Sequence, residues 1–210
     1  MKTSKITLRY GLILGLVALI CTAISTAIYL LTQSKIEQVT AQQQRQLLLE
    51  VVPQNYFDND LLATCKKINL PEFPFLNKIF IAKKQQEPTA YAIQATAPDG
   101  YSGNIVLLIG IDPKGTILGV RTLEHKETPG LGDKIETRVS DWIYDFSNQP
   151  FNPDNQEQWA VKKDGGQFDQ FTGATITPRA VVNMVRKSGN WAIETLNSQP
   201  NVTDTFEQCN

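Results

Sequence analysis

The stretch Ile105–Thr122, IVLLIGIDPKGTILGVRT, predicts a β-hairpin and sets the fold class. Its two apolar halves flank Asp112-Pro-Lys-Gly115, where Asp, Pro and Gly occupy positions that favour a tight turn. Upstream, Lys78–Ala82 and Ala90–Ala95 flank Gln85-Gln-Glu-Pro88, and we interpret both segments as strands with a period of two. We therefore expect four antiparallel strands between residues 77 and 122.

Helical patterns surround this predicted sheet. Ser34–Gln54 is rich in helix formers, and we expect a helix there, with a flexible glutamine-rich linker as the alternative. Asp133–Phe146 has apolar residues on one helical face and predicts a helix capped by Asp133. Thr177-Pro178 predicts the start of a last helix that ends near residue 196, with Thr177 as N-cap. The predicted class is α+β, with Trp159–Lys162 as a further short strand.

A long apolar run lies near the N-terminus. Tyr10–Ser34 has no charged residue, and Gly11–Leu31 reads GLILGLVALICTAISTAIYLL. About 20 apolar residues in a helix span a bilayer core. A buried helix of a soluble protein and a cleaved signal peptide are the alternatives. Because Ile28–Leu31 continues the run past the small residues Ser25–Ala27, we expect an uncleaved transmembrane helix over residues 10–32.

The charges beside this run predict its orientation. Lys2, Lys5 and Arg9 precede it without an acidic residue, so residues 1–9 are expected in the cytoplasm and the rest of the chain in the periplasm. Removing these three from the 20 Lys and Arg leaves 17 against 21 Asp and Glu, a net charge of −4 for the exported part. A nucleic acid is therefore not an expected partner, since binding it needs a basic face.

Three cysteines and one histidine limit the metal chemistry. Cys65 and Cys209 are in the exported part, where they form either a disulfide or two free thiols. Cys21 lies inside the apolar run. The sequence has no CxxC pair and no Cys/His cluster, so no metal site is predicted. His125 is interpreted as a structural or solvated residue.

Two small-residue segments are candidate binding elements. Thr172-Gly-Ala-Thr175 precedes the last predicted helix, whose N-terminal N–H groups favour an anion such as phosphate. A plain capped helix is the alternative. Thr128–Gly132 (TPGLG) is a loop whose glycines let the backbone approach a flat ligand. Lys162 and Lys163 are either phosphate partners or a solvated strand edge.

The residues Asp169-x-x-Thr172-Gly-Ala-Thr175-x-Thr177 resemble the flavinylation signature D-x-x-(S/T)-G-A-T-x-(S/T). Periplasmic flavin transferases read this signature and attach FMN to a threonine through a phosphoester. Together with HKETPGLGDK, GYSGNI and WAVKKDGG, nearly the whole chain resembles the G subunit of the Rnf electron-transport complex, also called Rsx. The C subunit of the sodium-translocating NADH:quinone reductase is a more distant relative with the same flavin domain.

The resemblance implies which residues bind the cofactor. It implies covalent FMN on Thr175, and it implies no catalytic base, so neither His125 nor Glu127 is given that role. The further cofactor-binding residues that it implies are the rest of the signature, the loop around the flavin ring and, by extension, one lysine: Thr172, Gly173, Ala174, Thr177, Thr128, Pro129, Gly130, Leu131, Gly132 and Lys162.

The function implied is that of a membrane-anchored flavoprotein subunit that relays electrons within an ion-translocating complex of the cell inner membrane. The expected partners are the other membrane and iron–sulfur subunits and a periplasmic flavin transferase. The C-type quinone reductase subunit and a non-redox exported binding domain are the alternatives. The predicted segments are the cytoplasmic N-terminus 1–9, the span 10–32, a helical linker 33–75, the FMN-binding domain 76–198 and a tail 199–210.

Overall fold

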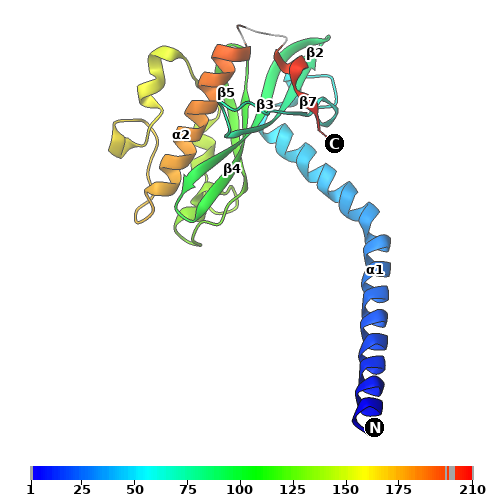
Figure 1. The fold of residues 1–210 in the computed structure, drawn as a ribbon. Helices are drawn as coiled ribbons and strands as arrows, with labels where there is room; N and C mark the ends of the chain where they lie inside the picture. Colours follow the sequence, from blue (N-terminus) through cyan, green and yellow to red (C-terminus); the bar gives the residue numbers. More distant parts are fainter. Residues whose placement is uncertain (1, 197, 199–201, 210) are drawn as a thin grey trace. The chain divides into compact units, whose positions relative to one another are not determined.

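The computed structural model describes residues 2–196, 198 and 202–209, with side chains from Leu8 onward (Figure 1). The chain forms two compact units, residues 1–44 and residues 45–210, each taken by itself below. The predicted domain boundaries remain predictions. The proposed junction at 198/199 and the charges of Lys2 and Lys5 fall on residues or side chains outside those described.

The N-terminal helix α1 covers Lys2–Val51. Between Leu8 and Val39 its large apolar side chains are exposed, from 48% at Ile20 to 80% at Leu31. The helix is long and apolar enough to cross a membrane by length and composition, a test that a signal sequence also passes. Because α1 is continuous to Val51, the segment from Ser34 is helical and is not a flexible linker.

The second unit is built on one antiparallel sheet with the strand order β6-β5-β4-β3-β2-β1-β7. Its four long strands confirm the predicted ones: β2 (Leu76–Lys84), β3 (Glu87–Gly100), β4 (Gly103–Ile111) and β5 (Thr116–Glu124). The predicted turn closes β4–β5: the Gly115 N–H donates to the Asp112 carbonyl at 3.0 Å. Gly115 has φ +88°, a value that favours glycine.

Short elements complete the fold. The edge strands are β1 (Lys66–Lys67), β6 (Gln149–Pro150) and β7 (Glu207–Gln208). The short helices are η1 (Gln54–Tyr56), η2 (Leu62–Thr64), η3 (Gly132–Ile135), η4 (Trp142–Phe146), η5 (Pro153–Gln158), η6 (Lys162–Asp164) and η8 (Val202–Thr205). The second long helix, α2, covers Ile176–Trp191 and continues as the π-helix η7 (Ala192–Leu196).

One face of the sheet is covered by the end of α1. Leu48, Val51 and Val52 are buried there in one apolar cluster with side chains of β2, β3, β4 and β5. The backbone approaches closely because two strand positions are glycines. A Cβ on Gly110 would lie 1.9 Å from the Val51 carbonyl oxygen, and one on Gly119 would lie 3.0 Å from the Glu50 carbonyl oxygen. These glycines make the close contact between helix and sheet possible.

The opposite face carries α2, which contacts β3 and β4 (Figure 1). Its buried residues include Val181, Val182 and Val185, at the spacing of one helical face. Beside them lies an aromatic cluster in which the Phe146 and Phe168 rings stack with centroids 4.3 Å apart. This cluster holds the irregular segment between β5 and α2 against the sheet.

The disulfide hypothesis is confirmed: Cys65 and Cys209 are bonded. The bond belongs to the α1 side of the sheet, since Cys65 is buried in the same cluster as Val51. The Cys209 N–H also donates to the Cys65 carbonyl at 3.1 Å. The bond closes a loop across almost the whole second unit, because the two residues are 144 positions apart.

Two local predictions were wrong. The predicted helix Asp133–Phe146 is two short 3-10 helices, η3 and η4, joined by a turn, and Asp133 does not cap η3. The apolar face of the predicted helix consisted of five residues. Of these, Val139 is exposed, and the other four are buried: Ile135, Trp142, Ile143 and Phe146. The predicted strand Trp159–Lys162 is a single bridge between Val161 and Phe168. In both segments, packing of large aromatic side chains determined the backbone more than local periodicity did.

Candidate functional site

The start of α2 differs from the prediction by two residues. The N-cap is Thr175, not Thr177, and the helix begins at Ile176. Thr175 has αR backbone angles, and its side chain makes no capping hydrogen bond. The Thr175 hydroxyl is therefore not used to satisfy the helix end. Thr177 lies inside the first turn, fully buried, and its hydroxyl points to another element.

A tight turn places Thr175 at this helix end. The Ala174 N–H donates to the Phe171 carbonyl at 3.1 Å. Gly173, the third residue of the turn, has φ +81°. Only glycine adopts this angle without strain, so its place in the sequence is explained by the turn. Thr172, at the second position, is exposed.

The loop Thr128–Gly132 forms the facing wall. The Thr128 carbonyl accepts hydrogen bonds from the N–H groups of Leu131 and Gly132, both at 3.1 Å. Gly130 has φ +78° and lies at the outer end of this turn. The Leu131 Cδ2 lies 3.7 Å from the position of a Cβ on Gly173, so the loop and the Thr175 turn are neighbours.

Between these two segments lies a cavity of about 300 Å³. Tyr101, from the β3–β4 turn, also lines it. The lining comprises Tyr101, Glu127, Thr128, Leu131, Gly132, Gly173, Ala174, Thr175, Ile176 and Thr177. The structure thus brings together seven of the predicted site residues. Pro129, Gly130, Lys162 and Thr172 lie outside this lining.

Three lining residues, Tyr101, Ile176 and Glu127, were not among the predicted cofactor-binding residues, and Glu127 is the only buried one of these three. Its side chain is buried, with 5% exposed. Its Oε2 accepts a hydrogen bond from the Thr177 hydroxyl at 2.5 Å, and its Oε1 accepts one from the Ser102 N–H at 3.0 Å. The signal available in the sequence was only its position beside the TPGLG loop. Its contact with Thr177, 50 residues away, is decided by the fold.

His125 has the structural role that was predicted. Its Nδ1 accepts a hydrogen bond from the Glu127 N–H at 3.0 Å, so Nε2 carries the proton toward Glu136 Oε1 at 2.5 Å. Arg138 bonds the same carboxylate. The hydrogen bond from Arg138, aided by His125, lowers the pKa of Glu136 to about 2. These contacts order the segment between β5 and η4 behind the cavity.

Lys162 forms an ion pair with Asp169 at 2.7 Å, and both side chains are largely exposed. Asp169 is the first residue of the predicted signature, and its carbonyl accepts a hydrogen bond from Trp142 Nε1 at 2.8 Å. Arg179 in α2 binds Asp164 through two nitrogens, at 2.6 and 2.8 Å, which lowers the pKa of that carboxyl. The first ion pair joins η6 to the start of the predicted signature, and the second joins η6 to the first turn of α2.

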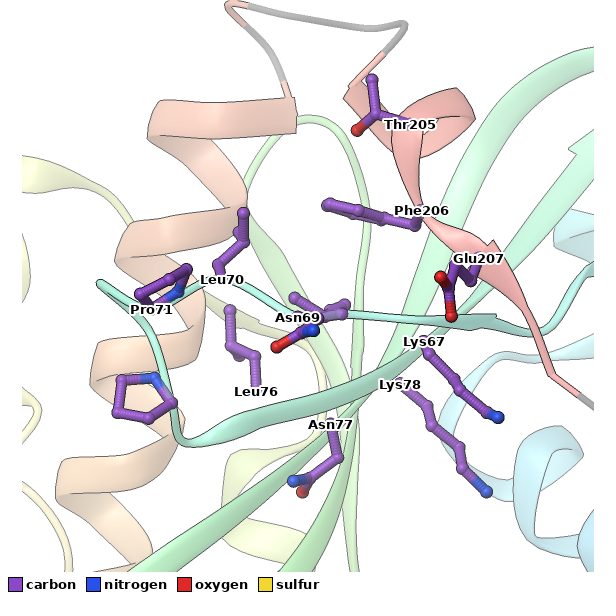
Figure 2. Close-up of a pocket in the computed structure, with 12 residues that line it drawn as sticks. Lys67, Asn69, Leu70, Pro71, Leu76, Asn77, Lys78, Thr205, Phe206 and Glu207 are labelled. Atoms are coloured by element: carbon purple, nitrogen blue, oxygen red, sulfur yellow. The ribbon is translucent and has the colours of Figure 1, made fainter.

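A larger hollow, of about 780 Å³, lies elsewhere, between the segment around β1 and the C-terminal tail (Figure 2). Figure 2 shows Lys67 and Lys78 on one side of it, with Phe206 and Leu70 on the other. It contains none of the predicted site residues. The smaller cavity is the better candidate site, because separate segments of the predicted motifs meet there. Within the described part of the chain, no group of three metal-ligating side chains occurs.

Comparisons with known proteins show the family of the chain. Residues 100–189 match the FMN-binding domain family, and residues 1–51 match the RnfG N-terminal region. The chain is 59% identical over 201 residues to the G subunit of the ion-translocating oxidoreductase complex of Pasteurella multocida (strain Pm70), covering 95% of this chain and all of the relative.

Two other comparisons complete these findings. The G subunit of the same complex in Haemophilus influenzae (strain 86-028NP) is 58% identical, with 95% of each chain covered. The crystal structure of Shewanella oneidensis NqrC gives a TM-score of 0.46 at 19% identity, covering 74% of this chain and 72% of that one. The predicted α+β class, with one apolar N-terminal helix and an antiparallel sheet, is confirmed. The chain belongs to the family of G subunits of ion-translocating oxidoreductase complexes.

Proposed function

We propose that this chain is the flavoprotein subunit of an Rnf-type ion-translocating oxidoreductase complex and relays electrons through FMN esterified to Thr175. The observation that carries the proposal is the position of Thr175. It caps α2 without using its hydroxyl and lines the cavity formed by the two predicted motifs. High identity to several G subunits favours this complex over the C-type quinone reductase subunit.

The residues present fit FMN. The cavity volume of about 300 Å³ is at the lower end for ligand pockets and suits part of such a molecule. The lining combines the apolar side chains of Tyr101, Leu131 and Ile176 with threonine hydroxyls, as a flat ring with polar edges requires. Gly173 presents no side chain there, and a Cβ at that position would meet only Leu131.

The start of α2 suits a phosphoester at Thr175. The first N–H groups of a helix lack partners within the helix, and the macrodipole favours negative charge there. The Thr175 side chain makes no capping hydrogen bond, so a phosphate on its oxygen would meet donors that the cap leaves free. Thr128, Leu131 and Gly132 would enclose the flavin from the other side.

Bound FMN would supply one- and two-electron chemistry, and the protein would supply its position and its electrostatic surroundings. A covalent link keeps such a carrier from being lost outside the cytoplasm. The chain would carry no independent catalysis. The described residues hold no metal-ligand cluster, so other subunits, including iron–sulfur ones, would bring electrons to the flavin.

The proposed location is the inner membrane, with α1 as a single span and the flavin domain in the periplasm. The exposed apolar side chains of α1 support the anchor. The Cys65–Cys209 disulfide supports the periplasmic side, because such bonds persist in oxidising compartments. A periplasmic flavin transferase would then meet the signature Asp169–Thr177 on that side.

Intact mass tests the proposal. The full-length chain, expressed together with a flavin transferase, should gain the mass of FMN less one water and should fluoresce as a flavin in a denaturing gel. Thr175→Ala should lose all of this gain. Thr172→Ser, which keeps the signature, is the matched control and should keep the flavin. A wild-type chain without added mass would refute the proposal and leave the non-redox binding domain.

A further inference from the structure

Glu127 is the only charged residue among the described residues that line the Thr175 cavity. Glutamates are rarely buried unless they are paired, yet this side chain is 5% exposed. Of the ion pairs between described residues, none involves Glu127. The cavity wall therefore contains one carboxylate without a cationic partner.

Neutral donors hold this carboxylate in place. The Ser102 N–H and the Thr177 hydroxyl bind its two oxygens, at 3.0 and 2.5 Å. Both donors are uncharged, so these bonds place no positive charge beside the carboxylate. They also join the loop after β5, which carries Glu127, to the β3–β4 turn and to the first turn of α2.

Two glycines make room for it. A Cβ on Gly132 would lie 2.8 Å from Glu127 Oε2 and 2.9 Å from Thr177 Oγ1. A Cβ on Gly100 would lie 2.9 Å from Glu127 Oε1 and, closer still, 2.3 Å from the Gly103 carbonyl oxygen. Neither glycine has a positive φ, so a left-handed backbone conformation is not the reason for glycine at these two positions. Their common feature is that both leave space for the Glu127 carboxylate.

We infer that the Glu127 carboxylate lowers the reduction potential of the flavin held at Thr175. The inference rests on the proposed function. Each electron that the flavin gains is lost by a reductant, another redox subunit in the complex or dithionite in an assay. A fixed negative charge in a poorly solvated wall raises the free energy of that added electron. Glu127 thus acts electrostatically and forms no bond with the flavin.

The test is a reductive titration of the full-length, flavin-loaded chain in detergent, with dithionite and redox indicator dyes. Glu127→Gln keeps the size of the side chain and an oxygen acceptor but removes the charge. The equilibrium constant for uptake of one electron should rise about tenfold, a potential increase of about 59 mV. Glu124→Gln is the matched control: it removes an exposed charge that does not line the cavity and should shift the potential far less.

Glu127→Asp provides a second variant. It keeps the negative charge and leaves the flavinylation signature intact, so the potential should stay much closer to wild type than in Glu127→Gln. An unchanged potential in Glu127→Gln with flavin attached would overturn the inference alone. A folded Glu127→Gln chain that takes up no flavin would also overturn it. Equal shifts of the reduction potential in Glu127→Gln and Glu124→Gln would do the same. Wild-type protein without flavin mass would overturn the proposed function and the inference together.

Discussion

The two faces of the sheet are built differently. On the α1 face, Val51 and its neighbours pack directly on glycine positions, and a disulfide joins the segments around them. On the α2 face, the middle of the helix packs on the sheet, but its first turn borders a cavity held by hydrogen bonds through Glu127. Apolar packing and a disulfide bond therefore stabilise the α1 face. On the α2 face, hydrogen bonds hold the start of α2 beside the cavity, and the cavity leaves space for a ligand.

The disulfide gives the largest expected effect on stability. Cys65→Ser with Cys209→Ser should lower the free energy of unfolding by about 2–5 kcal/mol, because the bond restrains a very long loop in the unfolded chain. Chemical denaturation of the purified chain measures this. Loss of stability without loss of flavin attachment would confirm that the α1 face is structural. Wild-type protein trapped in cells with both thiols free would contradict the disulfide itself.

A pair of glycine substitutions compares the faces directly. Gly110→Ala should destabilise the second unit by about 1–3 kcal/mol or more, since the new methyl group meets the Val51 backbone, which has little freedom to move. Gly189→Ala lies in α2, where a Cβ would come within 2.9 Å of the Phe151 ring. There the buried Phe151 ring would have to shift, and the helix propensity gained, about 0.8–1.0 kcal/mol, offsets only part of that strain.

Thermal melts of the two alanine variants measure the difference. Each kcal/mol shifts the Tm of a unit of this size by about 2–4 °C. Gly110→Ala should melt several degrees lower than wild type, and Gly189→Ala should show a smaller decrease. Equal losses in both variants would show that the two faces tolerate added volume alike, and the contrast between them would fail.

Low pH should destabilise the α2 face through the contacts of Glu136, by less than the substitutions above. The pKa of Glu136 is about 2, below the ordinary value of 4.5, because Arg138 and His125 bind its carboxylate. Its stabilising effect is therefore present above pH 4.5 and is lost as the pH falls toward 2. Arg138 is 77% exposed, and solvent screening reduces the effect to about 1 kcal/mol. Between about pH 6 and pH 2, stability should fall less in Glu136→Gln than in wild type, and identical pH profiles would contradict the assignment.

Much of the fold was predictable from local pattern. The apolar run in α1, the four long strands and the Asp112–Gly115 turn each follow from periodicity or from residues with a strong backbone preference. The segment Asp133–Phe146 was not predictable in this way. Its spacing of apolar residues fits a helix, but the buried rings of Trp142 and Phe146 hold it as two short turns.

The candidate site also has one part that the local sequence predicts and another part that it does not. The sequence by itself determined the signature Asp169–Thr177, the glycine turn at Gly173 and the TPGLG loop, because each depends on neighbouring residues. Only the tertiary structure decided that Thr175 caps α2 and that Glu127 reaches Thr177 and Ser102 inside one cavity. Contacts across 50 residues leave no periodic trace in a sequence, since they arise when the sheet brings the ends of distant segments together.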